Sequence, residues 1–174
     1  MKKKIAFLFT VLMLCSFTAF ANGTTLEFSI AAGENSTDAY LLGIKKHYSP
    51  WIQRGNFSVV PALGVTGFVW DPKHGDAVGG VSFLGALTLN FDKSGKAPYL
   101  AFSFGPTLIS AKHVGNRDMG GQFHFASTAS LGFRFGSKMR HALEGFYTHY
   151  SHGGLGGSQN PGLNIYGVTY KYSF

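Results

Sequence analysis

A histidine and a serine stand two residues apart near the C-terminus of the chain, at His149 and Ser151. On a β-strand, residues at this spacing point to the same face, with Cα atoms about 6–7 Å apart. The imidazole can then approach the hydroxyl and take its proton, which is the minimal form of an activated nucleophile. The pair predicts acyl transfer at a serine, although a histidine and a serine are also ordinary where a strand enters a polar loop.

A metal site is the other chemistry that histidines in this region could support. His141, His149 and His152 lie eight and three residues apart. On a strand these spacings do not bring three ligands to one point, and no carboxylate joins them. We therefore expect no metal, and acyl transfer at a serine requires no cofactor.

The predicted strand that carries the pair has two chemically different faces. Alternate residues on one face are mostly apolar and end in the polar pair: Leu143, Gly145, Tyr147, His149 and Ser151. The opposite face carries Arg140 and Glu144, which can pair with each other or with Lys171. We expect the two charges to point into the protein interior, so that His149 and Ser151 project outward.

Asn164 is predicted to join this pair from the next strand. It shares the parity of Tyr166 and Val168, which predicts an outward direction. A hairpin loop centred near residue 157 would place Asn164 beside His149. Asn160 lies within that loop, ahead of Pro161-Gly162.

Alternation with a period of two continues along most of the chain. Between residues 121 and 135, odd positions are mostly large and apolar, and even positions are small or polar. Turn signals rich in Gly, Asn, Asp and Pro divide the chain. We expect eight strands, near residues 24–32, 38–48, 56–70, 77–91, 97–112, 120–136, 138–151 and 163–174.

The composition favours a membrane barrel over a soluble β-protein. The 174 residues are 45% hydrophobic but only 13% charged, about half the usual charge of soluble domains. A soluble sandwich or barrel needs an outer face rich in Lys and Glu, whereas the second face here is small and neutral, as in the lumen of a small membrane barrel. The chain also ends Tyr170-x-Tyr172-x-Phe174, an aromatic ending that resembles the assembly signal of bacterial outer-membrane barrels. We predict an all-β fold, an eight-stranded antiparallel outer-membrane β-barrel filled by side chains rather than a pore.

The N-terminal segment has the pattern of a secretory signal peptide. Lys2–Lys4 precede an apolar run, and Ala19-Phe20-Ala21 forms a small-x-small cleavage site. We expect residues 1–21 to be the signal peptide and residues 22–174 to form one barrel domain, with both termini in the periplasm. Removal of the three lysines lowers the net charge from +7 to +4. No basic patch with interleaved aromatics indicates nucleic-acid binding.

Residues 149–164 resemble a known enzyme family. The segments His149-Tyr150-Ser151-His152-Gly153 and Asn160-Pro161-Gly162-Leu163-Asn164 look like the C-terminal hairpin of lipid A 3-O-deacylases, the PagL-like acyloxyacyl hydrolases. The resemblance implies an eight-stranded outer-membrane barrel whose His-Ser pair faces the outer leaflet. It implies that Ser151 is the nucleophile and His149 its general base. Asn160, with the backbone near His152 and Gly153, would form the oxyanion hole.

The chain departs from that family at two positions. The family's triad acid falls at Asn164, and the Asn that commonly follows the nucleophile is replaced by His152. The amide oxygen of Asn164 can still accept the imidazole N–H and fix its tautomer, as in Cys-His-Asn sites. An amide stabilises the imidazolium less than a carboxylate does, so the resemblance implies either a weaker triad or an inactive relative.

Three functions follow from these observations. The first is an outer-membrane esterase that removes an ester-linked acyl chain of lipid A, with lipopolysaccharide and membrane lipids as partners. The second is a non-catalytic small barrel, structural or adhesive, although the outer loops look short for adhesion. The third is a soluble periplasmic β-domain. The sequence leaves open whether the protein forms a homo-oligomer.

Overall fold

A computed structural model describes residues 23–155 and 162–174. Eight long strands form the wall, and a 3-10 turn, Glu34–Ser36 (η2), links the first two. They are β1 (Thr24–Gly33), β2 (Thr37–His47), β4 (Phe57–Pro72), β5 (Val78–Asn90), β6 (Tyr99–Ile109), β9 (Phe123–Phe135), β10 (His141–Ser151) and β11 (Leu163–Ser173). Three short strands lie in the connections: β3 (Ile52–Arg54), β7 (His113–Val114) and β8 (Arg117–Asp118).

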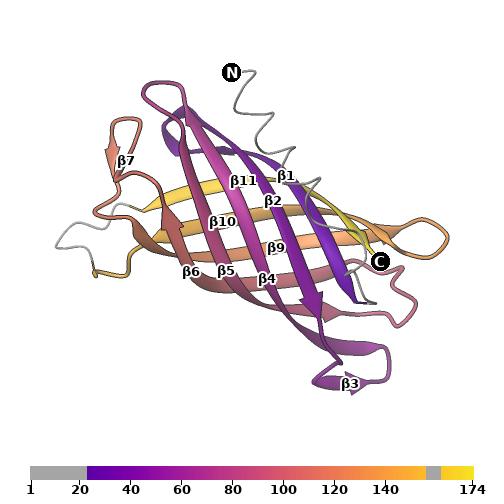
Figure 1. The fold of residues 1–174 in the computed structure, drawn as a ribbon. Coiled ribbons are helices and arrows are strands. Elements are labelled where there is room, and N and C mark those ends of the chain that lie inside the picture. Colours follow the sequence, from indigo (N-terminus) through magenta and orange to yellow (C-terminus); the bar gives the residue numbers. More distant parts are fainter. Residues whose placement is uncertain (1–22, 156–161) are drawn as a thin grey trace.

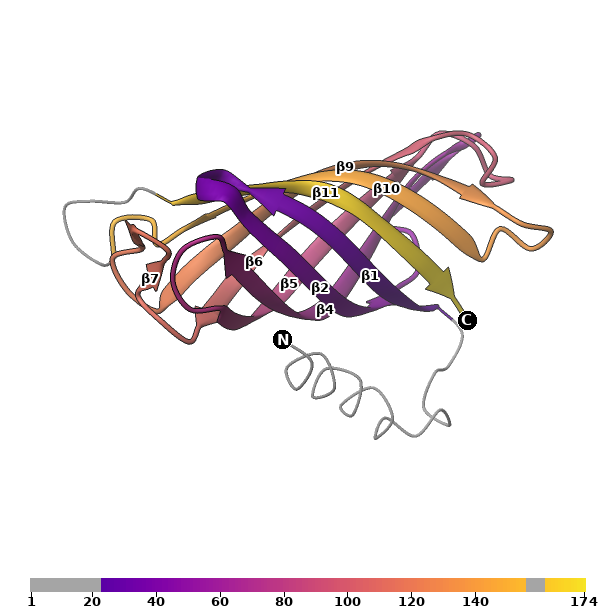
Figure 2. The ribbon, with the colours of Figure 1, turned by 90° about the horizontal axis from the view of Figure 1, so that it is seen from above.

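The sheet closes on itself into a barrel. Every long strand pairs antiparallel with its neighbour in the order β2-β1-β11-β10-β9-β6-β5-β4, and β2 also pairs with β4 (Figures 1 and 2). The last long strand therefore lies against the first, with Gly33 opposite Ile165. Closure removes the unpaired edges that an open sheet would expose.

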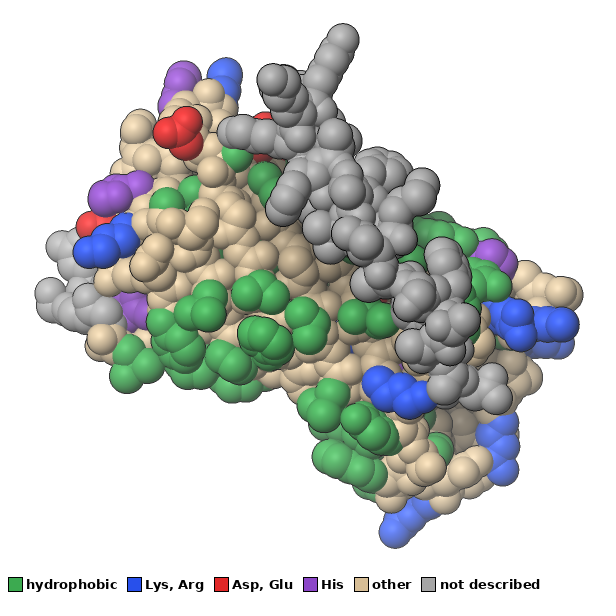
Figure 3. Space-filling view, in the orientation of Figure 1, with side chains coloured by type: hydrophobic (Ala, Val, Ile, Leu, Met, Phe, Trp, Pro, Cys, Tyr) green, Lys and Arg blue, Asp and Glu red, His purple; other side chains and the backbone are tan. Residues whose placement is uncertain are grey.

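The two faces of the wall differ as the alternation predicts. Along β9 the odd-numbered residues face outward, and at least half of the surface of Leu131 and Phe133 is exposed. The even-numbered residues Ala126 and Ser130 on the same strand face inward and are buried. In Figure 3, hydrophobic side chains form a band along the lower part of the visible face, and most Lys and Arg side chains lie toward the ends of the molecule. Exposed large hydrophobic side chains occur on all eight long strands. A continuous apolar outer belt suits a bilayer rather than water. The prediction of an eight-stranded antiparallel outer-membrane barrel is confirmed.

The interior is filled by side chains and ion pairs. Lys171 lies 2.8 Å from a Glu27 oxygen and 2.5 Å from a Glu144 oxygen, and Lys45 lies 3.0 Å from the other oxygen of Glu27. The Tyr99 hydroxyl donates to Glu144 at 2.8 Å. Because these charges are paired within the lumen, they do not face lipid.

An aromatic cluster fills the interior beneath one end of the barrel. Trp70 is fully buried, stacks on Phe68 with ring centroids 4.6 Å apart, and meets the ring of Tyr150 edge-on at 4.8 Å. Tyr150 is the inward-facing residue between His149 and Ser151, so this cluster supports the strand segment that carries the pair.

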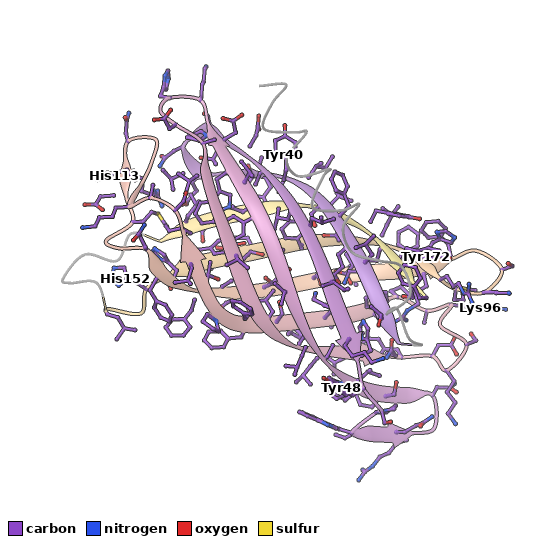
Figure 4. All side chains as sticks on the ribbon, in the orientation of Figure 1. Tyr40, Tyr48, Lys96, His113, His152 and Tyr172 are labelled. Carbon is purple, nitrogen blue, oxygen red and sulfur yellow. The ribbon has the colours of Figure 1, made fainter. Side chains whose placement is uncertain are left out.

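The connections at the two ends of the barrel are distinct. The end opposite the C-terminus holds η2, the β7–β8 hairpin and the start of β11 (Figure 1). His113 and His152 lie at this end in Figure 4, and Lys96 and Tyr172 lie at the other. Within the described ranges, no helix combines the length and apolar character needed to cross a bilayer.

The predicted strands agree with the structure except at several ends and connections. Prediction from alternation omits β3, β7 and β8, because strands of two or three residues are too short to reveal a period. Arg140 was expected inside the barrel, and this is wrong: it is exposed in the turn before β10, which begins only at His141. Glu144 does point inward and is 5% exposed. The predicted signal peptide lies outside the described residues.

Candidate active site on the outer wall

His149 and Ser151 lie at the end of β10 on its outward face. Both are partly exposed, whereas Thr148 and Tyr150, which alternate with them, are buried. The strand register sets His149 opposite Ser127 and Ser151 opposite Phe125 on β9. The imidazole and the hydroxyl therefore share the face that the sequence predicts.

Asn164 lies directly across from His149 on β11. Its Oδ1 is 2.7 Å from His149 Nδ1. A carbonyl oxygen can only accept, so Nδ1 carries the proton and donates it to the amide. This tautomer leaves Nε2 unprotonated in the neutral ring, which is the state that a general base requires.

Two further side chains contact Asn164, and the sequence predicted neither contact. The Tyr147 hydroxyl donates to Oδ1 at 2.7 Å. Glu34, in η2, accepts from Asn164 Nδ2 at 2.9 Å and from its backbone N–H at 3.3 Å. The sequence did contain a signal for Glu34: a closed barrel pairs its first and last strands, which brings the turn after β1 beside the start of β11.

Arg117 links three connections at this end of the barrel. From β8, its Nη1 donates to Glu34 Oε2 at 2.8 Å and to the carbonyl oxygen of Gly162. Gly162 lies beside the His149 ring and has φ +58°, a conformation that glycine adopts without strain. Arg117 thereby fixes the start of β11 relative to η2.

The residues predicted for the oxyanion hole follow Ser151 in a tight turn. The Leu155 N–H donates to the His152 carbonyl at 3.0 Å, and Gly153 and Gly154 both have positive φ. The His152 side chain is 1% exposed and faces the His124 ring, with centroids 6.0 Å apart. At this position only the backbone can serve a substrate on the outer wall. Asn160 lies outside the described residues.

The histidines that raised the metal alternative are spread along the strand. His141 lies at the other end of β10, where its Nδ1 contacts the Tyr170 hydroxyl at 2.7 Å. His149 bonds to Asn164 on the outer wall, and His152 is turned inside. The three rings do not converge on a common point.

An apolar groove begins at His149 and crosses the outer wall. Small residues on β9 and β5, among them Ser127, Ala129 and Gly85, form its floor, and Phe102, Phe104 and Tyr147 rise around them. It extends toward Trp51 in the connection that carries β3. The site therefore opens onto a surface that an extended hydrocarbon chain can occupy.

The electrostatics of the site come from Glu34. The hydrogen bond from the Asn164 amide, followed by its backbone N–H and Arg117, holds the pKa of Glu34 below its ordinary value of 4.5. Glu34 is consequently a carboxylate at neutral pH. The site therefore contains the negative charge of Glu34, although residue 164 is a neutral asparagine.

Comparisons with known proteins agree with this architecture. The chain is 28% identical over 120 residues to lipid A deacylase PagL of Bordetella bronchiseptica; the match covers 69% of this chain and 65% of that relative's length. The fold matches the crystal structure of the outer-membrane enzyme PagL with a TM-score of 0.77 at 20% identity, over 86% of this chain and 99% of that one. A model of the family described as lipid A 3-O-deacylase (PagL) matches residues 23–173. The chain therefore belongs to the lipid A 3-O-deacylase (PagL) family.

Proposed function

We propose that this protein is an outer-membrane ester hydrolase that removes the 3-O-linked acyl chain of lipid A. Family membership and the named Bordetella relative support this substrate. The observation that carries the proposal is the His149–Asn164 hydrogen bond beside Ser151, at the end of an outward apolar groove. Lipid A anchored in the outer leaflet could reach this site without leaving the membrane.

The proposed chemistry divides ester hydrolysis into two steps. The Ser151 Oγ attacks the ester carbonyl carbon while His149 Nε2 takes the hydroxyl proton. The carbonyl oxygen becomes an oxyanion, for which the backbone N–H groups of His152 and Gly153 and the side chain of Asn160 are the candidate donors. The bond from carbon to the sugar oxygen then breaks, and His149 returns its proton to that oxygen. Water hydrolyses the acyl-enzyme by the same route.

The acyl chain would lie in the groove on the outer wall. Tyr147, Phe102 and Phe104 line this groove, and each is about half exposed on the outward wall. Tyr166 and Val168 are also about half exposed, but they lie outside the groove on β11, and Leu143 shares the outward face of β10. Hydrocarbon in this position replaces bilayer lipid, so little desolvation opposes binding. We infer that the groove aligns the ester with Ser151 while the sugar headgroup stays at the membrane surface.

The proposal is tested by comparing lipid A from outer membranes that contain the wild type or Ser151→Ala. Loss of one hydroxyacyl chain only with the intact serine supports an esterase. Heat-modifiable migration on gels, the usual mark of a folded barrel, serves as the control that both proteins assemble. Identical lipid A mass spectra from two folded proteins would overturn the proposal.

A further inference from the structure

A carboxylate from elsewhere in the barrel lies beside Asn164, the position at which the family resemblance places the triad acid. Position 164 carries an amide, but the Glu34 carboxylate lies 2.9 Å from the nitrogen of that amide and 130 residues away in sequence. Barrel closure creates this contact, since β1 ends at Gly33 opposite Ile165 and η2 begins one residue later. Glu34, Asn164 and His149 thus form one continuous chain of hydrogen bonds.

We propose that Glu34 is the acid of this site and acts through Asn164 as a positioning residue. This inference rests on the proposed esterase function. Glu34 does not touch the imidazole. It is proposed to orient the Asn164 amide and to place a negative charge behind it.

The orientation follows from the donors and acceptors that are present. An ionised carboxylate only accepts hydrogen bonds, so it requires the NH₂ group of Asn164 to face it. The amide oxygen must then face His149, where it selects the tautomer with the proton on Nδ1. A flipped amide would set oxygen against carboxylate and NH₂ against Nδ1, and that tautomer has a protonated Nε2 that cannot take the serine proton.

The other contacts to Asn164 do not make this selection. The Tyr147 hydroxyl also meets Oδ1, but a hydroxyl can donate or accept and therefore tolerates either orientation. Arg117 bonds to Oε2 of Glu34 at 2.8 Å, whereas the Asn164 side chain bonds to Oε1, and the guanidinium compensates part of the charge of Glu34. Of the side chains described above that bond to the Asn164 amide, the Glu34 carboxylate admits a single amide orientation.

The charge should also stabilise the protonated His149 that forms during acyl transfer. A carboxylate one amide away interacts less strongly with the imidazolium than a directly bonded one, because the interaction falls with distance and Arg117 shares the charge. Its removal should lower the rate by about 10- to 100-fold, by analogy with the range found for side chains that orient a metal-bound histidine through a hydrogen bond. The loss should be smaller than that caused by Ser151→Ala.

An isosteric exchange of the two groups provides the decisive experiment. Glu34→Gln removes the charge, and Asn164→Asp creates one in direct contact with His149 without changing the shape of either side chain. We expect Glu34→Gln to lower kcat for lipid A by about 10- to 100-fold. The double variant Glu34→Gln/Asn164→Asp should recover to within a few-fold of wild type, because the carboxylate now contacts the imidazole itself.

The pH profile separates a catalytic effect from a structural one. In Glu34→Gln the imidazole should be less basic, so the acid limb of kcat/KM should move to lower pH, and in the double variant it should return. If Glu34 only held η2 against Arg117, Glu34→Gln would not shift the acid limb. The added Asn164→Asp substitution would then not restore the lost rate. Asp38→Asn, which removes an exposed carboxylate next to the same turn, is the matched control and should behave as wild type.

Two outcomes would overturn the inference. One is a folded Glu34→Gln protein with the rate and pH profile of wild type, and the other is a loss of rate that the double variant fails to restore. With either outcome, an inactive Ser151→Ala protein would still support the proposed esterase function. If Ser151→Ala retains full activity, the proposed function fails instead.

Discussion

The side-chain amide of Asn164 donates to the carboxylate of Glu34 across 130 residues of sequence, at 2.9 Å. The same amide accepts from His149 on its other side. The fold thereby brings a carboxylate from a distant turn within one amide group of the His149 imidazole.

Glycine at position 162 should be required for the His149 ring to keep its position. A Cβ there would lie 2.8 Å from both the ring's Cε1 and the carbonyl oxygen of Tyr150, and φ +58° is strained for alanine. We expect Gly162→Ala to lower the deacylation rate about tenfold or more while the barrel still assembles. Gly67→Ala, where no atom lies within 4 Å of the added Cβ, is the control. Equal deacylation rates for Gly162→Ala and Gly67→Ala would show that the His149 ring does not require glycine at position 162.

Filling the outer groove should impair turnover of lipid A more than turnover of a short soluble ester. Ala129 lies on the groove floor, so Ala129→Trp would occupy the volume proposed for the acyl chain. We expect about a tenfold lower kcat/KM for lipid A and little change for a short-chain ester. Ile30→Trp introduces the same large side chain on the lipid-facing wall of β1, outside the groove. Loss of activity on both substrates would show that the substitution disturbs the catalytic groups rather than chain binding.

The lumen ion pairs should contribute to stability rather than to chemistry. Lys171→Met would leave the buried carboxylates of Glu27 and Glu144 without their shared cation. Breaking a buried pair in this way costs about 3–5 kcal/mol. Urea unfolding in micelles should show that loss, whereas Lys93→Met at an exposed turn should not. A stable Lys171→Met barrel would mean that the two carboxylates take up protons instead.

The Glu34 contact should respond to acid but not to changes near neutral pH. Its folded-state pKa is lowered, chiefly by the Asn164 hydrogen bond, so the contact is present above the ordinary value of 4.5 and is lost as pH falls through the lowered value. The groups facing it are Arg117 and Asn164, with Tyr147 and His149 beyond the amide. The Asn164 side-chain NMR resonance should titrate below pH 4.5 in wild type and lack that step in Glu34→Gln. A wild-type resonance unchanged in this range would argue against the contact in solution.

Local patterns in the sequence determine most of the wall and the sidedness of the pair. A strand repeats every two residues, so alternation assigns His149 and Ser151 to one face and Glu144 to the other without knowledge of the fold. The link from His149 to Asn164 is similarly accessible, because a hairpin joins adjacent strands and its register follows from the loop between them. Arg140 could not be assigned in this way, since alternation carries no information beyond the residue where pairing stops.

The rest of the site depends on contacts between distant parts of the chain. Glu34 and Arg117 reach Asn164 and Gly162 from turns after β1 and β6, and Trp70 supports Tyr150 from β4. Periodicity relates each residue only to its neighbours along a strand, so it is silent on which turns meet at one end of the barrel. Barrel closure pairs the first and last strands and so brings Glu34 to Asn164. The folding of the β6–β9 connection over the end of the barrel brings Arg117 to Gly162, and packing across the lumen brings Trp70 to Tyr150.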